Sequence, residues 1–502
     1  MLVDYPNHLA RYWLLLGGAS HPSLASDYAV DWGRSSLVGG DMLALLLGQF
    51  VPYAIAGKMI VFLVLAGPPV GAACLSRLVF GRWHWWQLSF PLLTWSTTGL
   101  FGFLAFQISL ALALVFVCVD ILLPAGTAIK IVLRIFFGCI ILFVHPFGLG
   151  FYALTLFAMI VGPEWQTLRD RSRQVSIVRN TSISVLPALI LPVIGLLYFS
   201  FTLPVNNLKR SSLFSWEFQP ILIFNRVFAP FLAYQRDVDL LFLAPLVALI
   251  GYSLYRRRIQ THAGLVVVGL FLFVVSVIAP TRVGDEPSAG VRFSIMAALL
   301  LFSGILPNPF GGYAARIAAA AAMFCLSFAR LTYIDHIWQA RQSDVLSLES
   351  ALSHVPPGAK VFALEYEWSN PKAAPAGRFL VYDRAPWGTV FRHAPALVIP
   401  QRQGFIPSLF AIPGEQPVRF LPPWDRLAPF VFYQVPDAHV LDKPPSPQVV
   451  RNDPYLLDWD ERFDYVVLIE ADHDNAYGPF NPPPQLQLVS DNGYARLYRV
   501  RK

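Results

Sequence analysis

The chain has 502 residues, of which 55% are hydrophobic and 14% are charged, whereas soluble domains carry roughly 25% charged residues. Together with a mean hydropathy of +0.52, this composition excludes an ordinary soluble protein and indicates an integral membrane protein. The net charge of +7 is carried by the residues before Arg341, and a basic excess inside apolar sequence argues against nucleic-acid binding.

The first polar segment, Asp4-Tyr-Pro-Asn-His8-Leu-Ala-Arg11, precedes a series of apolar runs. Its spacing predicts a helix on which Asp4, His8 and Arg11 share one face. In one interpretation Asp4 caps the helix, with Pro6 in its first turn, and His8 and Arg11 are ordinary surface groups. In the other, Asp4 is a general base, while His8 or Arg11 orients it or binds a phosphate.

Three more charged residues follow before or near the start of the first apolar run. Asp27 and Asp31 are spaced i, i+4, so they either share a divalent metal, support the base, or simply solvate a loop. Lys58 lies near the outer end of the run. A lysine there is a functional candidate, or it extends to the membrane surface.

Apolar runs long enough, or nearly long enough, to cross a bilayer recur about ten times. The stretch between Phe90 and Leu122 also fits one broken helix followed by one full span. The predicted spans are residues 53–79, 84–98, 99–122, 128–144, 147–162, 184–203, 238–255, 263–280, 293–309 and 317–334.

The distribution of basic residues predicts the orientation of these spans. Alternate short loops are rich in Lys and Arg, which marks the cytoplasmic side. We therefore predict a transmembrane domain at 1–335, with outer loops 1–52, 204–237 and 281–292, and an extracytoplasmic soluble domain at 336–502. The basic residues are Arg77, Arg82, Lys130, Arg134, Arg169, Arg171, Arg173, Arg179, Arg256, Arg257, Arg258 and Arg316.

The outer side also carries candidate phosphate ligands. His145 lies in an outer turn between two spans, where it either lines a site or is a satisfied turn residue. Arg282 and Arg292 bracket Asp285-Glu286 in an outer loop. Because a guanidinium matches a phosphate bidentately, these arginines are candidates for holding a lipid phosphate; the alternative is ion pairing within the loop. Further candidates are Arg226 and Arg236.

From about Ile334 the sequence is typical of a soluble domain. It predicts a helix at 343–354, strands at 360–364 and 465–469, and a terminal hairpin turning at Asn492-Gly493. An α/β or α+β domain of this length is large enough for its own core. No His/Cys cluster has zinc spacing, so a divalent metal remains a possibility only at the carboxylates.

The multi-span bundle, the acidic motif and the C-terminal extracytoplasmic domain together resemble the GT-C superfamily of polyprenyl-phosphate-sugar-dependent glycosyltransferases. The segment Asp4–Arg11 is similar to the first-loop aspartate motif of bacterial members, of the mannosyltransferase or aminoarabinose transferase type. The resemblance implies a GT-C-like fold with Asp4 as the catalytic base. It departs in two ways: the helix that precedes this loop in the family is absent before Met1, and the loop has no adjacent Asp-Glu pair.

The resemblance also implies a function: an enzyme that transfers a sugar from a polyprenyl-phosphate donor, with inversion, to a glycan, lipid or protein at the outer face of a bacterial inner membrane. A transporter or lipid flippase is the main alternative, and it predicts charges along the interior of the spans. A scaffold whose exterior domain binds partners is the second alternative. In the predicted topology the ionisable groups gather at one membrane surface and few lie within the spans, which favours the enzyme.

Overall fold

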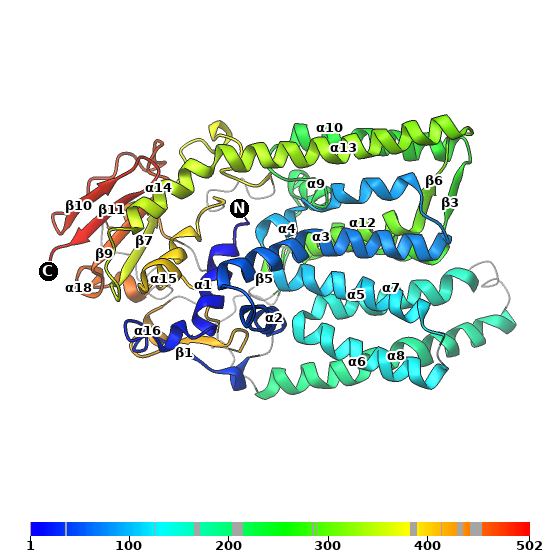
Figure 1. The fold of residues 1–502 in the computed structure, drawn as a ribbon, viewed down its shortest axis with the longest axis horizontal. Helices are drawn as coiled ribbons and strands as arrows, with labels where there is room; N and C mark the ends of the chain where they lie inside the picture. Colours follow the sequence, from blue (N-terminus) through cyan, green and yellow to red (C-terminus); the bar gives the residue numbers. More distant parts are fainter. Residues whose placement is uncertain are drawn as a thin grey trace. The chain divides into compact units, whose positions relative to one another are not determined.

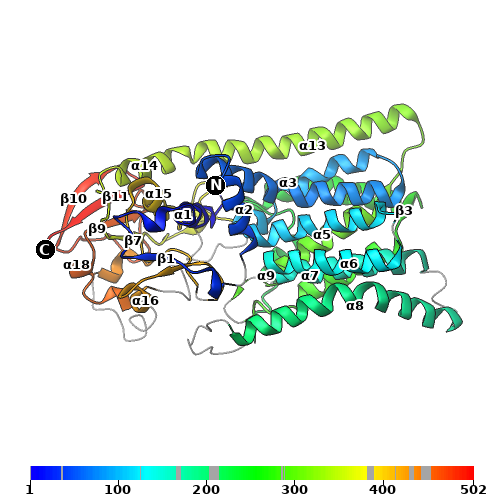
Figure 2. The same ribbon diagram turned by 60° about the horizontal axis from the view of Figure 1, so that its bottom comes forward.

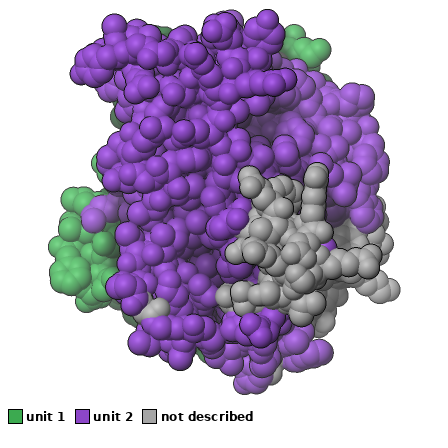
Figure 3. Space-filling model, turned by 90° about the vertical axis from the view of Figure 1, so that its right-hand side faces the viewer, with its two compact units in different colours: residues 1–58, 203–208, 335–502 green, residues 59–202, 209–334 purple. Residues whose placement is uncertain are grey.

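The computed structural model describes residues 2–35, 38–124, 126–164, 171–202, 214–283, 286–287, 289–381, 389–412, 414–428, 435–441 and 454–502. The chain forms two compact units, each with its own hydrophobic core. Unit 1 comprises residues 1–58, 203–208 and 335–502, and unit 2 comprises residues 59–202 and 209–334 (Figure 3, green and purple).

Unit 2 is a bundle of apolar helices that run alongside one another (Figures 1 and 2). The sequence-based expectation of a polytopic helical bundle is therefore confirmed. Among the described residues, six helices are long and apolar enough to cross a membrane: α3, α5, α6, α7, α10 and the stretch Tyr313–Leu352. The main helices are α3 (Tyr53–Phe80), α5 (Leu104–Leu122), α6 (Thr127–Val144), α7 (Pro146–Glu164), α8 (Arg171–Thr202), α10 (Arg236–Tyr255), α11 (Ala263–Ile278), α12 (Ala289–Gly304) and α13 (Tyr313–Ala340), of which α3 begins and α13 ends in unit 1.

The connection between α3 and α5 departs from a regular helix. Residues Trp85–Leu93 form the 3₁₀ helix η3, and Thr97–Phe101 form the short helix α4. Pro91 lies inside η3 and has no amide to continue a helical ladder, while the Ser96 hydroxyl caps α4 by accepting from the Gly99 amide. A regular helix over 84–98 was therefore wrong, and the alternative of a broken segment followed by a full span describes this region.

Short elements complete unit 2. The helix α9 (Pro220–Phe228) precedes α10. Strands β2 (Phe214–Ser215), β4 (Arg282–Val283) and β5 (Glu286–Pro287) form one small sheet, and β3 (Ile259–Thr261) pairs with β6 (Ile305–Pro307).

Unit 1 is built on a four-stranded sheet in the order β10-β11-β9-β7. Strands β7 (Val361–Glu365) and β9 (Tyr465–Ile469) are parallel, whereas β9, β11 (Arg496–Val500) and β10 (Leu486–Asp491) are successively antiparallel. The helix α14 (Gln342–Leu352) precedes the sheet in sequence and packs against it. The predicted strands and hairpin are confirmed, with Gly493 supplying the positive φ of 75° in the turn.

The N-terminal segment packs into unit 1. Helix α1 (Tyr5–Leu15) contacts η7 (Ala394–Leu397) and α15 (Val398–Arg402), and strand β1 (Tyr28–Val30) pairs with β8 (Val418–Phe420). Residues 1–58 thus belong to the same unit as residues 335–502, and residues 9–28 contribute to its core, although the sequence-based division assigned them to the transmembrane domain. The reason is packing, because Ala10, Leu14 and Tyr28 are buried in the same cluster as the strands.

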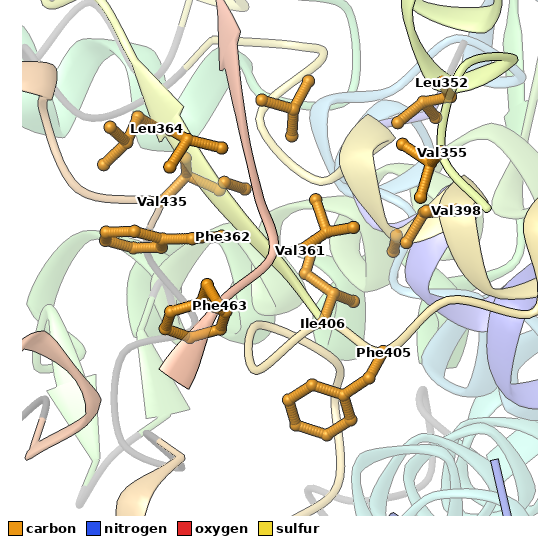
Figure 4. Packing of buried hydrophobic residues seen from close by; sticks show 14 of the residues in the cluster. Leu352, Val355, Val361, Phe362, Leu364, Val398, Phe405, Ile406, Val435 and Phe463 are labelled. Carbon is orange, nitrogen blue, oxygen red and sulfur yellow. The ribbon is translucent and has the colours of Figure 1, made fainter. Parts of the chain in front are cut away.

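The core of unit 1 is apolar and continuous around β7. Val361, Phe362 and Leu364 of this strand lie among side chains from both neighbouring helices and distant loops (Figure 4). The remaining short elements are η1 (Gly18–Ser20), η2 (Trp32–Arg34), α2 (Gly39–Gly48), η5 (Pro371–Ala373), α16 (Trp424–Leu427), η8 (Ala438–Leu441), η9 (Pro454–Leu456) and α18 (Trp459–Arg462).

Candidate functional site

The carboxylate of Asp4 lies at the start of α1 but does not cap it. Asp4 occupies the N-cap position, with proline in the first turn, yet its side chain makes no capping hydrogen bond. Instead, Asp4 Oδ1 lies 3.6 Å from Nε2 of His393, and the Asp4 side chain is 19% exposed. The capping interpretation is therefore wrong for the side chain, which is partly exposed.

His393 is a buried imidazole that the fold brings to Asp4. Burial, assisted by the positive charge of Arg392, lowers the pKa of His393 to about 3, so the ring is neutral at physiological pH. Its Nδ1 is buried without a hydrogen-bond partner among the described residues, which favours the tautomer with the proton on Nε2, facing Asp4. A separation of 3.6 Å is longer than a hydrogen bond, but such contacts often tighten when substrate binds.

Arg11 is buried and pairs with a carboxylate on α2. Its Nε donates to Asp41 Oδ1 at 2.8 Å, and its Nη2 lies 3.0 Å from Nδ1 of His8. Because the guanidinium is always protonated, His8 Nδ1 is the acceptor and the ring proton of neutral His8 sits on Nε2. The interpretation of Arg11 as a surface group is wrong. Burial raises the pKa of Asp41, against the opposing pull of Arg11.

Phe410 joins the two histidines. Its ring meets His8 edge-on at 6.0 Å and His393 edge-on at 5.0 Å between centroids, and its amide donates to the buried Asn7 side chain on α1 at 3.2 Å. These contacts bring together residues from both ends of the chain. We define the Asp4 site as Asp4, His8, Arg11, Asp41 and His393.

Asp27 and Asp31 do not come together. They flank the extended strand β1 rather than sharing a helical turn, and four extended steps separate residues by about 13 Å. Asp27 is buried in an ion pair with Lys360, whereas Asp31 lies 3.9 Å from the exposed Arg419. The described part of the chain contains no cluster of three or more His, Cys, Asp or Glu residues suited to a metal, so a shared metal at these carboxylates has no geometric support.

In unit 2, His145 and Arg292 lie close to the same aromatic residues. His145, in the turn between α6 and α7, accepts from the Phe147 amide at 3.2 Å. Arg292 is buried in the first turn of α12, with its guanidinium 4.9 Å from the Phe103 ring and 5.1 Å from the Phe147 ring. His145 and Arg292 both also contact Phe106. The structure thus brings these two predicted residues together.

Three other predicted basic residues, Lys58, Arg282 and Arg226, have different surroundings. Lys58 is exposed on α3. The backbone of Arg282 belongs to β4, but its side chain lies outside the described residues. Arg226 is buried and donates to the carbonyls of Ala279 (2.8 Å) and Val277 (3.4 Å), near the end of α11, so it stabilises the fold.

Sequence reasoning missed His393 and Asp41. Asp41 is a single charge within the apolar helix α2, a signal that was present in the sequence because isolated charges in apolar segments are commonly paired or functional. His393 had no such signal, since its partner lies at the opposite end of the chain. Comparisons with protein-family models, with curated proteins and with solved structures found no match, so the functional assignment depends on the geometry above.

Proposed function

We propose that the chain is a GT-C-type membrane glycosyltransferase, acting at the outer face of a bacterial inner membrane. It would transfer a sugar from a polyprenyl-phosphate donor to a glycan, lipid or protein acceptor. The observation that carries this proposal is the Asp4 site, in which a partly accessible carboxylate lies beside a buried, neutral imidazole. A carboxylate in this setting is suited to act as a general base.

The proposed reaction is a single displacement. The acceptor hydroxyl gives its proton to Asp4 while its oxygen attacks the anomeric carbon of the donor. The bond from that carbon to the phosphate oxygen breaks, and polyprenyl phosphate leaves with the electron pair, so the anomeric centre inverts. A neutral His393 orients the carboxylate of Asp4 without neutralising its charge.

We also propose Arg292 as a ligand of the lipid phosphate. Its guanidinium is buried among aromatic rings in unit 2, and in such a low-dielectric setting a charge-assisted hydrogen bond to phosphate is stronger than in water. Arg282, Lys58 and His145 remain candidates for the same role. His8 and Arg11 belong instead to the Asp4 site, where Arg11 is already bound to Asp41.

The proposed topology has about ten spans, with residues 336–502 outside the cytoplasm. Three apolar segments that are shorter than a full span add to the six long helices: Val185–Tyr198, α11 and α12. The alternation of basic loops supports this orientation. The irregular backbone of η3 and α4 is mostly buried, as membrane-embedded irregular segments must be.

A transporter or lipid flippase is the alternative function. It requires charged groups along a path through the spans. Among the described residues of unit 2, the ion pair Arg134–Asp120 lies near the junction of α5 and α6, and Arg330–Asp239 lies at the start of α10. Because the carboxylate of each pair lies within four residues of a helix end, we prefer glycosyl transfer.

Native mass spectrometry tests the donor site directly. The purified protein is incubated with undecaprenyl phosphate, or with phosphatidic acid as a control that has the phosphate monoester but not the polyprenyl chain. We expect saturable binding of undecaprenyl phosphate only, reduced at least tenfold by Arg292→Met and unchanged by Arg82→Met, which removes an exposed arginine. Equal binding of both lipids, or unchanged binding by Arg292→Met, would contradict the proposed donor site.

A further inference from the structure

Two segments of unit 1, residues 378–381 and 389–393, are the described arms of a loop, and the second arm reaches the Asp4 site. The two described arms of this loop, 378–381 and 389–393, pair through the Val390 amide, which donates to the Arg378 carbonyl at 2.8 Å, and through a bridge between Phe379 and Thr389. The second arm ends at His393. The second arm therefore carries the imidazole of His393, which lies beside Asp4.

Each arm forms an ion pair with a glutamate at the carboxyl-terminal end of a strand in the sheet. Glu365 is the last residue of β7, and Glu470 directly follows β9. These strands are parallel neighbours, with Glu365 opposite Ile469 in the register, so both carboxylates lie at the same carboxyl-terminal edge. Both glutamates are buried.

Both ion pairs are buried. Arg392 Nη2 lies 2.6 Å from Glu365 Oε1, and the Thr389 hydroxyl donates to the other oxygen at 3.2 Å. In the first arm, Arg378 Nη1 lies 2.6 Å from Glu470 Oε2, and Arg378 also pairs with Asp472. A buried ion pair adds little net stability over an apolar pair of the same shape. Stability alone therefore does not explain why these two ion pairs are present, and a role in fixing the geometry of the loop does.

We propose that the Arg392–Glu365 ion pair is a positioning device that holds His393 within reach of Asp4, with Arg378–Glu470 as the second anchor of the same loop. Arg392 directly precedes His393, so fixing the guanidinium on β7 fixes the backbone that carries the imidazole. The catalytic consequence depends on the proposed function, whereas the structural consequence does not.

Arg392 has a second effect on the same histidine. Among the described residues, the groups that face His393 are Asp4 ahead of α1, His8 of α1 through the Phe410 ring, and Arg392 itself. The positive charge of Arg392 adds to burial in disfavouring the imidazolium. One residue thus fixes the place of His393 and favours its neutral form, which is the form that orients a base without neutralising it.

The test separates positioning from stability with three variants of the full-length protein. Glu365→Gln removes the anchor and leaves Arg392 uncompensated. Glu365→Gln combined with Arg392→Met replaces the whole pair by uncharged groups, and such replacements commonly restore stability. Glu470→Gln is the matched control, since it removes an equally buried glutamate from the anchor farther from His393.

The readouts are hydrogen exchange of the peptides covering residues 2–12 and 389–397, and turnover of glycosylated undecaprenyl phosphate. We expect the double variant to regain thermal stability but to keep faster exchange in both peptides. We also expect a kcat at least tenfold below wild type, with KM for the donor unchanged, whereas Glu470→Gln should have the smaller effect on both readouts.

Two outcomes would overturn the inference. A double variant that regains wild-type exchange and wild-type kcat together with stability would show that the pair is merely structural. Wild-type exchange in the 2–12 peptide of that variant would show the same without any activity measurement. Absence of turnover in the wild-type protein would instead count against the proposed function, and the exchange readout would still decide the positioning role.

Discussion

The described buried arginines of unit 1 pair with carboxylates, whereas those of unit 2 contact carboxylates, carbonyl oxygens or aromatic rings. In unit 1, Arg11, Arg378 and Arg392 each pair with buried carboxylates. In unit 2, Arg134 and Arg330 also pair with carboxylates, but Arg226 donates to carbonyl oxygens near the end of α11, and the guanidinium of Arg292 lies against phenylalanine rings. A carboxylate neutralises the positive charge of a guanidinium, whereas carbonyl dipoles and aromatic rings stabilise that charge without neutralising it.

We therefore assign different roles to the arginines that pair with carboxylates and to those that contact carbonyl oxygens or aromatic rings. A neutralised pair fixes geometry, because neither partner can move without leaving a buried charge uncompensated. A cation that donates to carbonyl oxygens, as Arg226 does, keeps its net charge. The ion pairs of unit 1 are therefore suited to a positioning role, while Arg292 of unit 2 stays a proposed phosphate ligand.

The largest expected effect on stability comes from Arg378→Met. It leaves the buried Glu470, together with its acidic neighbours Asp344 and Asp472, without their shared cation. Breaking a buried pair from one side costs about 3–5 kcal/mol. Pulse proteolysis in urea, with sites assigned to residues 335–502, measures this change, and a loss below 1 kcal/mol would remove the basis for the comparison.

A smaller effect is expected from Arg226→Met in unit 2. The substitution leaves carbonyl oxygens at the end of α11 without a donor, but no uncompensated charge. Orphaned polar groups cost about 1–3 kcal/mol. The midpoint of thermal unfolding in detergent should therefore fall less than for Arg378→Met. An equal or larger fall would mean that carbonyl dipoles hold an arginine as firmly as carboxylates do.

The pH dependence of stability sharpens the comparison within unit 1. Burial raises the pKa of Glu470 from 4.5 to about 7, against the opposing charge of Arg378. The folded state then binds more protons than the unfolded state between these values, so stability falls as pH rises toward 7. Wild-type protein should melt at a lower temperature at pH 8 than at pH 6. Glu470→Gln should reduce that difference, and an unchanged difference would assign it to other groups.

The smallest effect is expected where an ion pair is exposed. Asp31 and Arg419 lie 3.9 Å apart at the surface, and exposed pairs contribute about 0–1 kcal/mol. Asp31→Asn should leave thermal unfolding nearly unchanged. A large loss would show that the N-terminal segment depends on this contact, and that burial is a poor guide to the importance of charges in this chain.

Local patterns predicted much of the fold. The continuous apolar run at Tyr465–Ile469 became the buried strand β9, and Asn492-Gly493 became the turn between β10 and β11. The i, i+4, i+7 spacing at Asp4, His8 and Arg11 predicted α1. These features were readable because periodicity and turn chemistry are local.

The remaining features depend on contacts distant in sequence. Nothing near Asp4 indicates that His393 lies beside it, and the helical spacing of Asp27 and Asp31 was misleading because β1 separates them. The packing of α1 against residues 394–402 likewise arises from a shared core. The sequence therefore predicted Asp4 as a candidate base, a role that stays a prediction, whereas only the structure identified the residues that surround Asp4.

The most direct test of the account is donor turnover by Asp4→Asn compared with Asp31→Asn. Both substitutions exchange a carboxylate for an amide in the N-terminal segment, but only Asp4 belongs to the Asp4 site. Proteoliposomes receive glycosylated undecaprenyl phosphates and envelope glycolipid acceptors, and mass spectrometry follows the release of undecaprenyl phosphate. We predict loss of at least about 100-fold for Asp4→Asn and wild-type turnover for Asp31→Asn. Equal turnover by the two variants, or none by the wild-type protein, would contradict the account.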